Sequence, residues 1–389
     1  MLRFLTAGES HGPGLLAILE GIPAGLPLGK SDLDPDLARR QKGYGVGPRM
    51  KSIERDEVTI VSGVLAGVTI GAPIGLQIAN RDHGKWRGRP LPVMSIPRPG
   101  HADLSAALKY GYRDLRFSLE RASARETAAR TAVGAVCRKL LAEFGILVGS
   151  YVTEIGSASA ELGEATYSER FAAAEQSDVR CPTDEGSTAM RDEIRAAMQA
   201  KDTLGGIFEV VALNLPPGLG SHVHWDRRLG TRLAAALMSI QGIKGVEIGH
   251  GFQNARRRGT EVQDEFEASD GRIRRRSNRA GGLEGGISTG DPLIVRAAMK
   301  PIPTTLTPRA SVDLASGEAA ETRYERSDFC SVPRAAVVGE AMLCFVLAEA
   351  LLERLGGDRL TEMRRRFEQL PRDRLDDLEM SDEPEIFWD

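Results

Sequence analysis

Two long alanine-rich segments constrain the fold of this chain more than any other feature. They read ETAARTAVGAVCRKLLAEFG (126–145) and PRAAVVGEAMLCFVLAEALLERLGG (333–357). Small and apolar residues surround most of each helical circumference, so each helix can be packed closely on more than one side. Such helices belong inside a domain, covered by neighbouring layers. The sequence therefore predicts an α+β fold, a single-domain layered β-α-β sandwich with the alanine-rich helices packed between antiparallel sheets.

Runs rich in β-branched residues predict the strands of these sheets at 57–61, 75–79, 146–155, 208–213 and 293–297. Capping signals and apolar periodicity predict helices over 35–41, 102–110, 119–144, 227–240 and 335–355. The first of these helices is expected to have Asp34 as its N-cap and Pro35 at its first position. The two alanine-rich helices could mark an internal duplication, although no loop motif is shared between the halves.

The absence of a proline-rich or low-complexity linker predicts one domain over residues 1–357. Residues 358–389 are strongly charged and are expected to form a tail or a packing arm. With 389 residues the chain can bury a sizeable core without disulfides or metals. The four cysteines form no CxxC pair and have no histidine at a metal-ligand spacing, so no metal is expected.

The overall charge of the chain argues against two classes of partner. A net charge of −3 gives no general attraction to nucleic acid or to an anionic membrane, so any electropositive surface must be local. The first residues, MLRFLTAGESHG, lack the apolar region of a secretory signal, and no apolar run of about 18 residues is evident. These features predict a cytoplasmic protein with reduced thiols.

The motif GESHG (8–12) follows a short apolar strand and places His11 and Ser10 in a glycine turn. An imidazole there could transfer protons near neutral pH, or it could be an ordinary turn histidine. The motif ARRQKGYGVGPR (38–49) places Arg39, Arg40 and Arg49 at a helix end and in a glycine loop. These cations could bind an anion, or they could simply complement the helix dipole.

The stretch RPGHADLSAALKYGYRDLRFSLERASARE (98–126) sets His101 among six cationic side chains. Arg121 and Arg125 are four residues apart, and on one long helix they would share a face and repel each other unless an anion lay between them. Glu120 and Glu126 could instead make this a solvated face. A nucleic-acid surface is less well supported, because alanine rather than aromatic residues separates the cations.

Three later segments also carry chemistry. NRAGGLEGG (278–286) follows runs of arginine and offers a glycine loop for a phosphate or a planar ring, without being a Rossmann or P-loop motif. MKPIPTTL spans 299–306 and RSDFCSVP spans 326–333. In the latter, Asp328 could form a structural ion pair with Arg326 or could be held for proton transfer.

These motifs, together with SIQGIKGVEIG (239–249), occur in an order that resembles the chorismate synthase family from Met1 to about Gly357. The resemblance implies conversion of 5-enolpyruvylshikimate 3-phosphate to chorismate and phosphate by anti-1,4-elimination, the last step of the shikimate pathway, with reduced FMN. It also implies a homotetramer with helices sandwiched between sheets.

The resemblance further implies roles for individual residues. His11 would donate a proton to the departing phosphate, His101 would lie near the pyrimidine edge of the flavin, and Asp328 would relay a proton from flavin N5. The expected substrate contacts are Ser10, Arg39, Arg40, Arg49 and Arg125. The expected FMN contacts are Arg121, Ala122, Ser123, Gln241, Gly242, Gly286, Lys300, Pro301, Ile302, Pro303, Thr304, Thr305 and Arg326.

One departure from the family pattern concerns the supply of electrons. Many members have an arginine where this chain has Val46, which weakens any NADPH contact there and favours dependence on a separate flavin reductase.

Two other classes of function stay open. An RNA-binding module would bind in a salt-dependent manner and ignore FMN, and an NADPH-dependent flavin oxidoreductase would consume NADPH without releasing phosphate.

Overall fold

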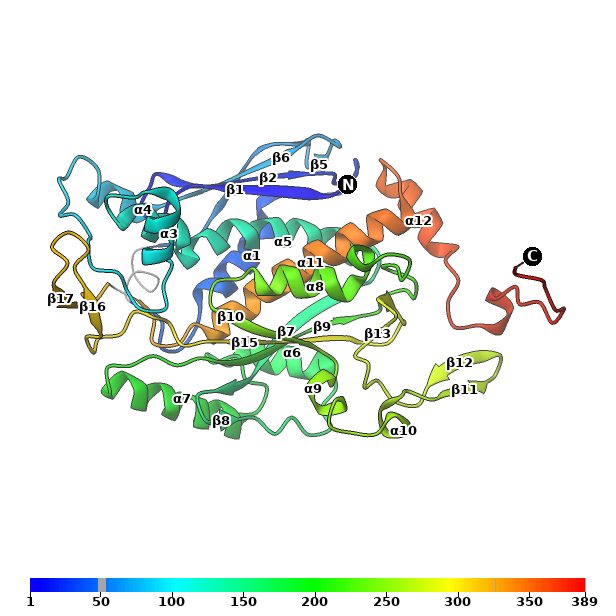
Figure 1. Ribbon diagram of the computed structural model, residues 1–389. Helices are drawn as coiled ribbons and strands as arrows, with labels where there is room; N and C mark the ends of the chain where they lie inside the picture. Colours follow the sequence, from blue (N-terminus) through cyan, green and yellow to red (C-terminus); the bar gives the residue numbers. More distant parts are fainter. Residues whose placement is uncertain (48–53, 326, 389) are drawn as a thin grey trace.

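The computed structural model describes residues 1–47, 54–325 and 327–388. Figure 1 shows two antiparallel sheets with helices running between them. The first sheet has the order β1-β2-β6-β3 and the second the order β10-β15-β9-β7-β8. Their strands are β1 Arg3–Ala7, β2 Gly14–Glu20, β3 Val58–Ser62, β6 Ile74–Ala79, β7 Leu147–Ile155, β8 Ala158–Ser159, β9 Gly206–Leu213, β10 Ile243–Ile248 and β15 Leu293–Met299.

Within the described residues, the layer between the sheets is formed by α1 Lys30–Gln41, α5 Thr127–Ala142, α8 Leu229–Met238 and α11 Val332–Leu355. α5 packs on β2 and β6, and α11 packs on β7 and β9. Two further helices, α6 Tyr167–Gln176 and α7 Asp184–Gln199, cover the outer face of the second sheet. The mixed helix and strand content predicted from the sequence is confirmed.

Shorter elements connect these layers and extend them at the edges. They are β4 Val64–Leu65, β5 Val68–Thr69, α3 Asp103–Tyr110, α4 Arg116–Ala122, α9 Gly251–Asn254, α10 Gly259–Val262, β11 Phe266–Ser269, β12 Arg272–Arg275, β13 Leu283–Glu284, β14 Ile287–Ser288, β16 Ala310–Val312, β17 Ala319–Glu321 and α12 Leu360–Glu368, with 3-10 turns at 81–85, 124–126, 225–227 and 375–377.

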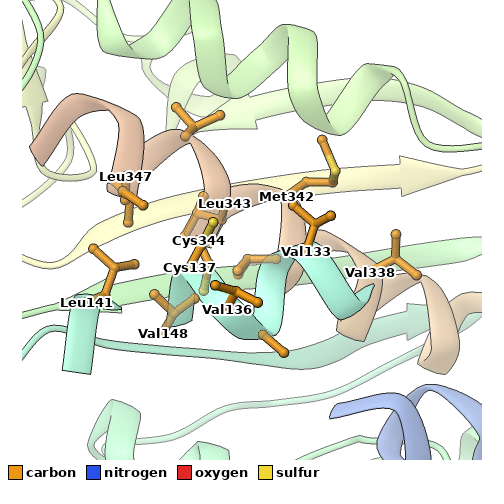
Figure 2. Packing of buried hydrophobic residues seen from close by; sticks show 14 of the residues in the cluster. Val133, Val136, Cys137, Leu141, Val148, Val338, Met342, Leu343, Cys344 and Leu347 are labelled. Carbon is orange, nitrogen blue, oxygen red and sulfur yellow. The ribbon is translucent and has the colours of Figure 1, made fainter. Parts of the chain in front are cut away.

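The contact between α5 and α11 forms the centre of the core. Figure 2 shows side chains of the two helices interdigitating, with Cys137 of α5 close to Cys344 of α11. Both cysteines are buried free thiols. Gly134 permits the close approach of the helices, because a Cβ there would lie 2.3 Å from the Cα of Ala341. The small residues that define this segment in the sequence therefore set the distance between the two helices.

We expect Gly134→Ala to destabilise the fold by about 1–3 kcal/mol, because the added methyl group must push α11 away. The sign of the change in unfolding free energy is informative. In an ordinary helix the same substitution would stabilise the fold by up to about 1 kcal/mol, because alanine favours the helix more than glycine does. Urea denaturation measures the difference. In the control Gly259→Ala the added atom meets open space, so its unfolding free energy should change by less than about 0.5 kcal/mol. An unchanged or raised midpoint in Gly134→Ala would contradict this packing argument.

α11 is long and apolar enough to cross a membrane by length and composition, but 83% of its most apolar window is buried inside the molecule.

The other alanine-rich segment does not form the predicted helix over 119–144. The chain is extended at Ser123, with φ −61° and ψ 137°, so α4 ends before it and α5 begins only at Thr127. The expectation that Arg121 and Arg125 share one helical face is therefore wrong.

The start of the first helix was also predicted wrongly. α1 begins at Lys30, so Pro35 lies inside the helix and Asp34 is not its cap. Asp34 instead accepts a hydrogen bond from the backbone amide of Val58 at 3.0 Å, which ties α1 to β3.

After residue 357, Leu360 and Met363 of α12 are buried in the main core, and the chain beyond α12 runs away from the body (Figure 1).

Candidate active site

A cavity of about 610 Å³ opens at the end of the helical layer where α11 begins. Its volume lies within the range of about 300–1,000 Å³ typical of small-molecule and cofactor sites. Segments far apart in the sequence form its wall. The predicted site residues that line it are Ser10, His11, Arg40, His101, Ala122, Ser123, Arg125, Gln241, Gly242, Lys300, Pro301, Ile302, Pro303, Thr304 and Asp328.

Four other predicted site residues do not line this cavity. Arg39 points away from it and binds Glu340, Glu175 and Asp36. Arg121 is exposed and donates to the carbonyl oxygens of Thr6 and Gly8. Thr305 donates to the carbonyl of Thr307, and Gly286 accepts from the amide of Leu229 beside α8. Arg49 and Arg326 lie outside the described residues.

His11 is held by Glu120 of α4. Its Nδ1 lies 2.7 Å from Glu120 Oε1, and its backbone amide donates to Oε2 at 2.7 Å. Its ring also packs against Trp86, with the ring centroids 4.3 Å apart. Burial opposes ionisation of Glu120, but the hydrogen bonds from His11 outweigh it and lower the pKa of the carboxyl group. An ionised carboxylate on Nδ1 fixes the ring and its tautomer, as in a catalytic dyad.

His101 is held in a similar way by Asp103, the first residue of α3. The imidazole Nδ1 lies 2.6 Å from Asp103 Oδ1. Arg98 also donates to Asp103 from its amide, from Nε and from Nη2. Burial raises the pKa of Asp103, but the bonds from His101 and Arg98 outweigh it and hold that pKa far below the usual value. Asp103 is therefore an ionised partner for a ring that faces the cavity.

Arg40 and Arg125 lie next to each other in the cavity wall. Arg40 comes from the end of α1 and Arg125 from the turn that follows Ser123. Both are buried, at 1% and 5% exposure. In the part of the chain that the structure describes, Arg125 Nη2 is buried without a hydrogen-bond partner, and Glu54 Oε2 lies 3.6 Å from it. A buried donor of this kind indicates a place for an oxyanion.

Asp328 is paired with Arg334 of α11, an ion partner that the sequence did not suggest. Oδ2 also accepts from Ser331 Oγ at 2.8 Å, and Oδ1 accepts from the amide of Gly47 at 2.8 Å. Arg334 in turn donates from Nε to the carbonyl of Arg40 at 3.0 Å. Asp328 therefore joins the glycine loop after α1 to the start of α11.

The cavity wall is strongly cationic. Among the described residues that line it, six are arginine or lysine and two are acidic: Arg40, Arg98, Arg125, Lys244, Lys300 and Arg334, with Glu325 and Asp328. Such a surface suits a small ligand with several negative charges. Within the described ranges, no three His, Cys, Asp or Glu side chains lie close enough together to hold a metal ion.

Sequence reasoning missed several contributors to this wall, among them Trp86, Arg98 and Arg334. Trp86 stands in the run RDHGKWRGR (81–89), where a single aromatic among cations was a usable signal. Arg98 lies three residues before His101, but no role of its own was assigned to it from the sequence. Arg334 lies within an alanine-rich helix, and only the fold brings it back to the glycine loop.

Comparisons with known proteins agree with one another. A sequence model of the family described as chorismate synthase matches residues 2–352. Chorismate synthase of Aquifex aeolicus (strain VF5) is 54% identical over 385 residues, covering 94% of this chain and 96% of the relative. Chorismate synthase of Desulforudis audaxviator (strain MP104C) is 53% identical over 373 residues, covering 93% and 95%. A crystal structure of chorismate synthase matches with a TM-score of 0.79 at 49% identity, covering 95% and 96%.

Proposed function

The chain belongs to the chorismate synthase family, and from this membership we infer that it converts 5-enolpyruvylshikimate 3-phosphate to chorismate and phosphate. This reaction is a lyase step of the shikimate pathway and of aromatic amino acid biosynthesis. The resemblance drawn from the ordered motifs is thereby confirmed at the level of the family. We also propose the cofactor, the residues that act in the site and the assembly.

The observation that carries the proposal is the cationic cavity with its unsatisfied buried donor on Arg125. The substrate carries two carboxylates and a phosphate, so it needs several guanidinium groups. Arg40, Arg98 and Arg125 line the cavity and fit this need, with Ser10 as a neutral hydroxyl partner. Arg39 is left out of this set, because three carboxylates already occupy its guanidinium.

The elimination breaks the bond between carbon and the phosphate oxygen at one end of the diene system and removes a hydrogen at the other. His11 is the proposed general acid for the departing phosphate, because Glu120 holds its ring from Nδ1 and a proton can leave from Nε2. His101 is proposed to present a positive charge to the cofactor. Asp328 is proposed to take part in removal of the second proton.

Other residues of the cavity wall fit a flavin mononucleotide. In the described chain Gln241 Oε1 is a buried acceptor without a hydrogen-bond partner, and the flavin pyrimidine ring carries an N–H donor that can satisfy it. Reduced FMN, when bound, would supply electron density that helps expel the phosphate. The lining residues proposed to hold it are Ala122, Ser123, Gln241, Gly242, Lys300, Pro301, Ile302, Pro303 and Thr304. Arg326, which lies outside the described residues, is proposed on family grounds alone.

The remaining features of the protein are proposed on the same family grounds. Residues 1–357 would form one catalytic domain, built as a layered β-α-β sandwich, with 358–389 as a packing arm. The protein would act in the cytoplasm as a homotetramer, without nucleic-acid or membrane partners. Val46 is buried and does not line the cavity, which supports dependence on a separate flavin reductase.

An anaerobic assay with chemically reduced FMN tests the function. We expect the protein to form chorismate and release phosphate under these conditions, and to do neither with oxidised FMN plus NADPH. Absence of both products with reduced FMN would overturn the proposed function. Steady NADPH consumption without phosphate release would indicate a flavin oxidoreductase instead.

Asp328→Asn tests the proposed second proton step. The amide keeps the shape of the side chain but cannot accept a proton, so we expect kcat to fall by about 10²-fold or more. Stopped-flow measurement of chorismate formation, in single turnover with reduced FMN, gives the rate. Ser316→Ala, in an exposed turn between β16 and β17, is the control and should match the unmodified protein. Unchanged single-turnover kinetics in Asp328→Asn would remove the residue from proton transfer.

A further inference from the structure

A carboxylate that does not line the cavity lies directly behind Arg40 and Arg125, two buried arginines of the cavity wall. Asp56 precedes β3, and its side chain is fully buried. Oδ2 accepts a hydrogen bond from Arg40 Nη1 at 3.0 Å, and Oδ1 accepts one from Arg125 Nη1. The backbone amide of Asp56 is fixed by Gln41 Oε1 at 2.9 Å. One carboxylate therefore holds two guanidinium groups, each through a different oxygen.

The remaining donors of the two arginines are divided between protein and cavity. Arg40 donates from Nε to Thr127 Oγ1 and from Nη2 to the carbonyl of Ala124. Arg125 donates from Nε to Asn80 Oδ1, while its Nη2 has no hydrogen-bond acceptor among the described residues. Each guanidinium is thus fixed in orientation. Glu54 Oε2 lies 3.6 Å from Arg125 Nη2, which is beyond hydrogen-bonding distance, so this donor can still bind a ligand oxygen.

Two buried cations side by side repel each other strongly unless an anion lies between them. The charged groups that face Arg40 are Asp56, Arg125, Arg334 and Asp328, from four different segments. Burial is the main effect that lowers the pKa of Arg40, to about 9, with Arg334 and Arg125 acting in the same direction. Asp56 opposes all three, so it preserves the charge of Arg40 as well as its position.

We propose that Asp56 is a positioning residue that joins Arg40 and Arg125 into a single clamp for one oxyanion of the substrate. Asp56 balances part of the positive charge of the pair, Glu54 Oε2 lies 3.6 Å from Arg125 Nη2, and Arg98, Lys300 and Arg334 of the cavity wall supply further positive charge for the ligand. The inference rests on the proposed function in one respect, which is that the oxyanion belongs to 5-enolpyruvylshikimate 3-phosphate.

The test is the affinity for this substrate, measured by isothermal titration calorimetry between pH 7.5 and 9.5 without flavin. We expect Asp56→Asn to raise the Kd about 10- to 100-fold at pH 7.5, since the paired geometry is lost. Binding by the unmodified protein should weaken only as the pH approaches about 9, where Arg40 begins to lose its proton. In Asp56→Asn that loss should begin at a lower pH, with Kd rising up to about tenfold per pH unit.

Two further variants separate this role from a merely structural one. Asp56→Glu keeps the charge, so its affinity should fall by less than that of Asp56→Asn, and its pH dependence should follow the unmodified protein. Asp264→Asn removes a buried carboxylate that accepts from Ser277 and from the amides of Arg279 and Ala280, outside the cavity wall. It should leave the Kd and its pH dependence unchanged even if it lowers the melting temperature.

The inference is overturned if the unmodified protein binds the substrate and Asp56→Asn binds it equally well with the same pH dependence. Should Asp56→Asn not fold, an unchanged Kd in Asp56→Glu overturns it instead, because an added methylene must displace the carboxylate. Failure of the unmodified protein to bind the substrate would count against the proposed function. Inorganic phosphate is then the probe for the clamp, and equal binding by both proteins would refute it.

Discussion

Replacing His11 with alanine is expected to lower kcat for phosphate release by about 10²–10⁴-fold while leaving the fold intact. Glu120 and Trp86 hold the imidazole in one orientation at the cavity wall, so the group that would protonate the leaving oxygen is placed before substrate arrives. His101→Ala should cause a loss of similar size, since the ring that Asp103 orients faces the same cavity. Phosphate release with reduced FMN under anaerobic conditions is the measurement.

A surface histidine provides a matched control for His11→Ala. His224 has a carboxylate partner of the same kind, with Nδ1 2.6 Å from Asp226 Oδ1, but the pair is exposed and does not line the cavity. His224→Ala should therefore keep the full rate. Near-normal phosphate release by His11→Ala would remove the general-acid role, and a melting temperature far below normal would show that the loss came from unfolding.

The largest effect on stability is expected from Glu340→Ala. Glu340 is fully buried on α11 and accepts hydrogen bonds from Arg39 of α1, Arg138 of α5 and Arg180. Removing it leaves three arginines without their shared carboxylate, so the unfolding free energy should fall by about 3–5 kcal/mol. Urea denaturation at pH 7 measures this loss. Glu353→Ala on the same helix removes an exposed pair with Arg232 and should cost less than about 1 kcal/mol.

The same carboxylate predicts a pH dependence. Burial raises the pKa of Glu340, but the three arginines outweigh it and lower the pKa from 4.5 to about 2. A carboxyl group whose pKa is lower in the folded state stabilises the fold above its unfolded pKa, and this contribution is lost as the pH falls from about 4.5 to about 2. The difference corresponds to about 3 kcal/mol. In Glu340→Ala this part of the acid transition should be absent, and an identical acid transition would contradict the assignment.

Local signals in the sequence predicted that a strand or helix would form more reliably than they predicted the residues at which it begins and ends. The five strand-like runs match β3, β6, β7, β9 and β15, because β-branched residues and burial act together in these strands. The helix break at Ser123 was missed, since alanine and arginine on both sides favour helix. Ser123 closes a turn by accepting from the amide of Arg125 at 3.3 Å, and this turn directs Arg125 toward Asp56 and the cavity.

The candidate site residues were predicted from sequence motifs. The motifs do not show which side chains from distant segments contact each other in the fold. His11 was singled out by its glycine turn and His101 by its cationic neighbours, but nothing in the sequence joins Arg334 to Asp328 or Asp56 to two arginines. Those contacts depend on how α1, α11 and the segment before β3 meet. Arg39 and Arg40 illustrate the limit, because adjacent residues of one type point in opposite directions, one to Glu340 and the other to the cavity.

The position of α11 near the end of the chain has a consequence for synthesis. Both sheets and α5 leave the ribosome before α11, yet α11 is the element that fills the space between them. At about 5–20 residues per second, translation from the end of α5 to the start of α11 takes on the order of 10–40 s. During that time the apolar faces of α5, β7 and β9 have no α11 to cover them. The core of this protein therefore closes late in synthesis, after most of the chain has left the ribosome.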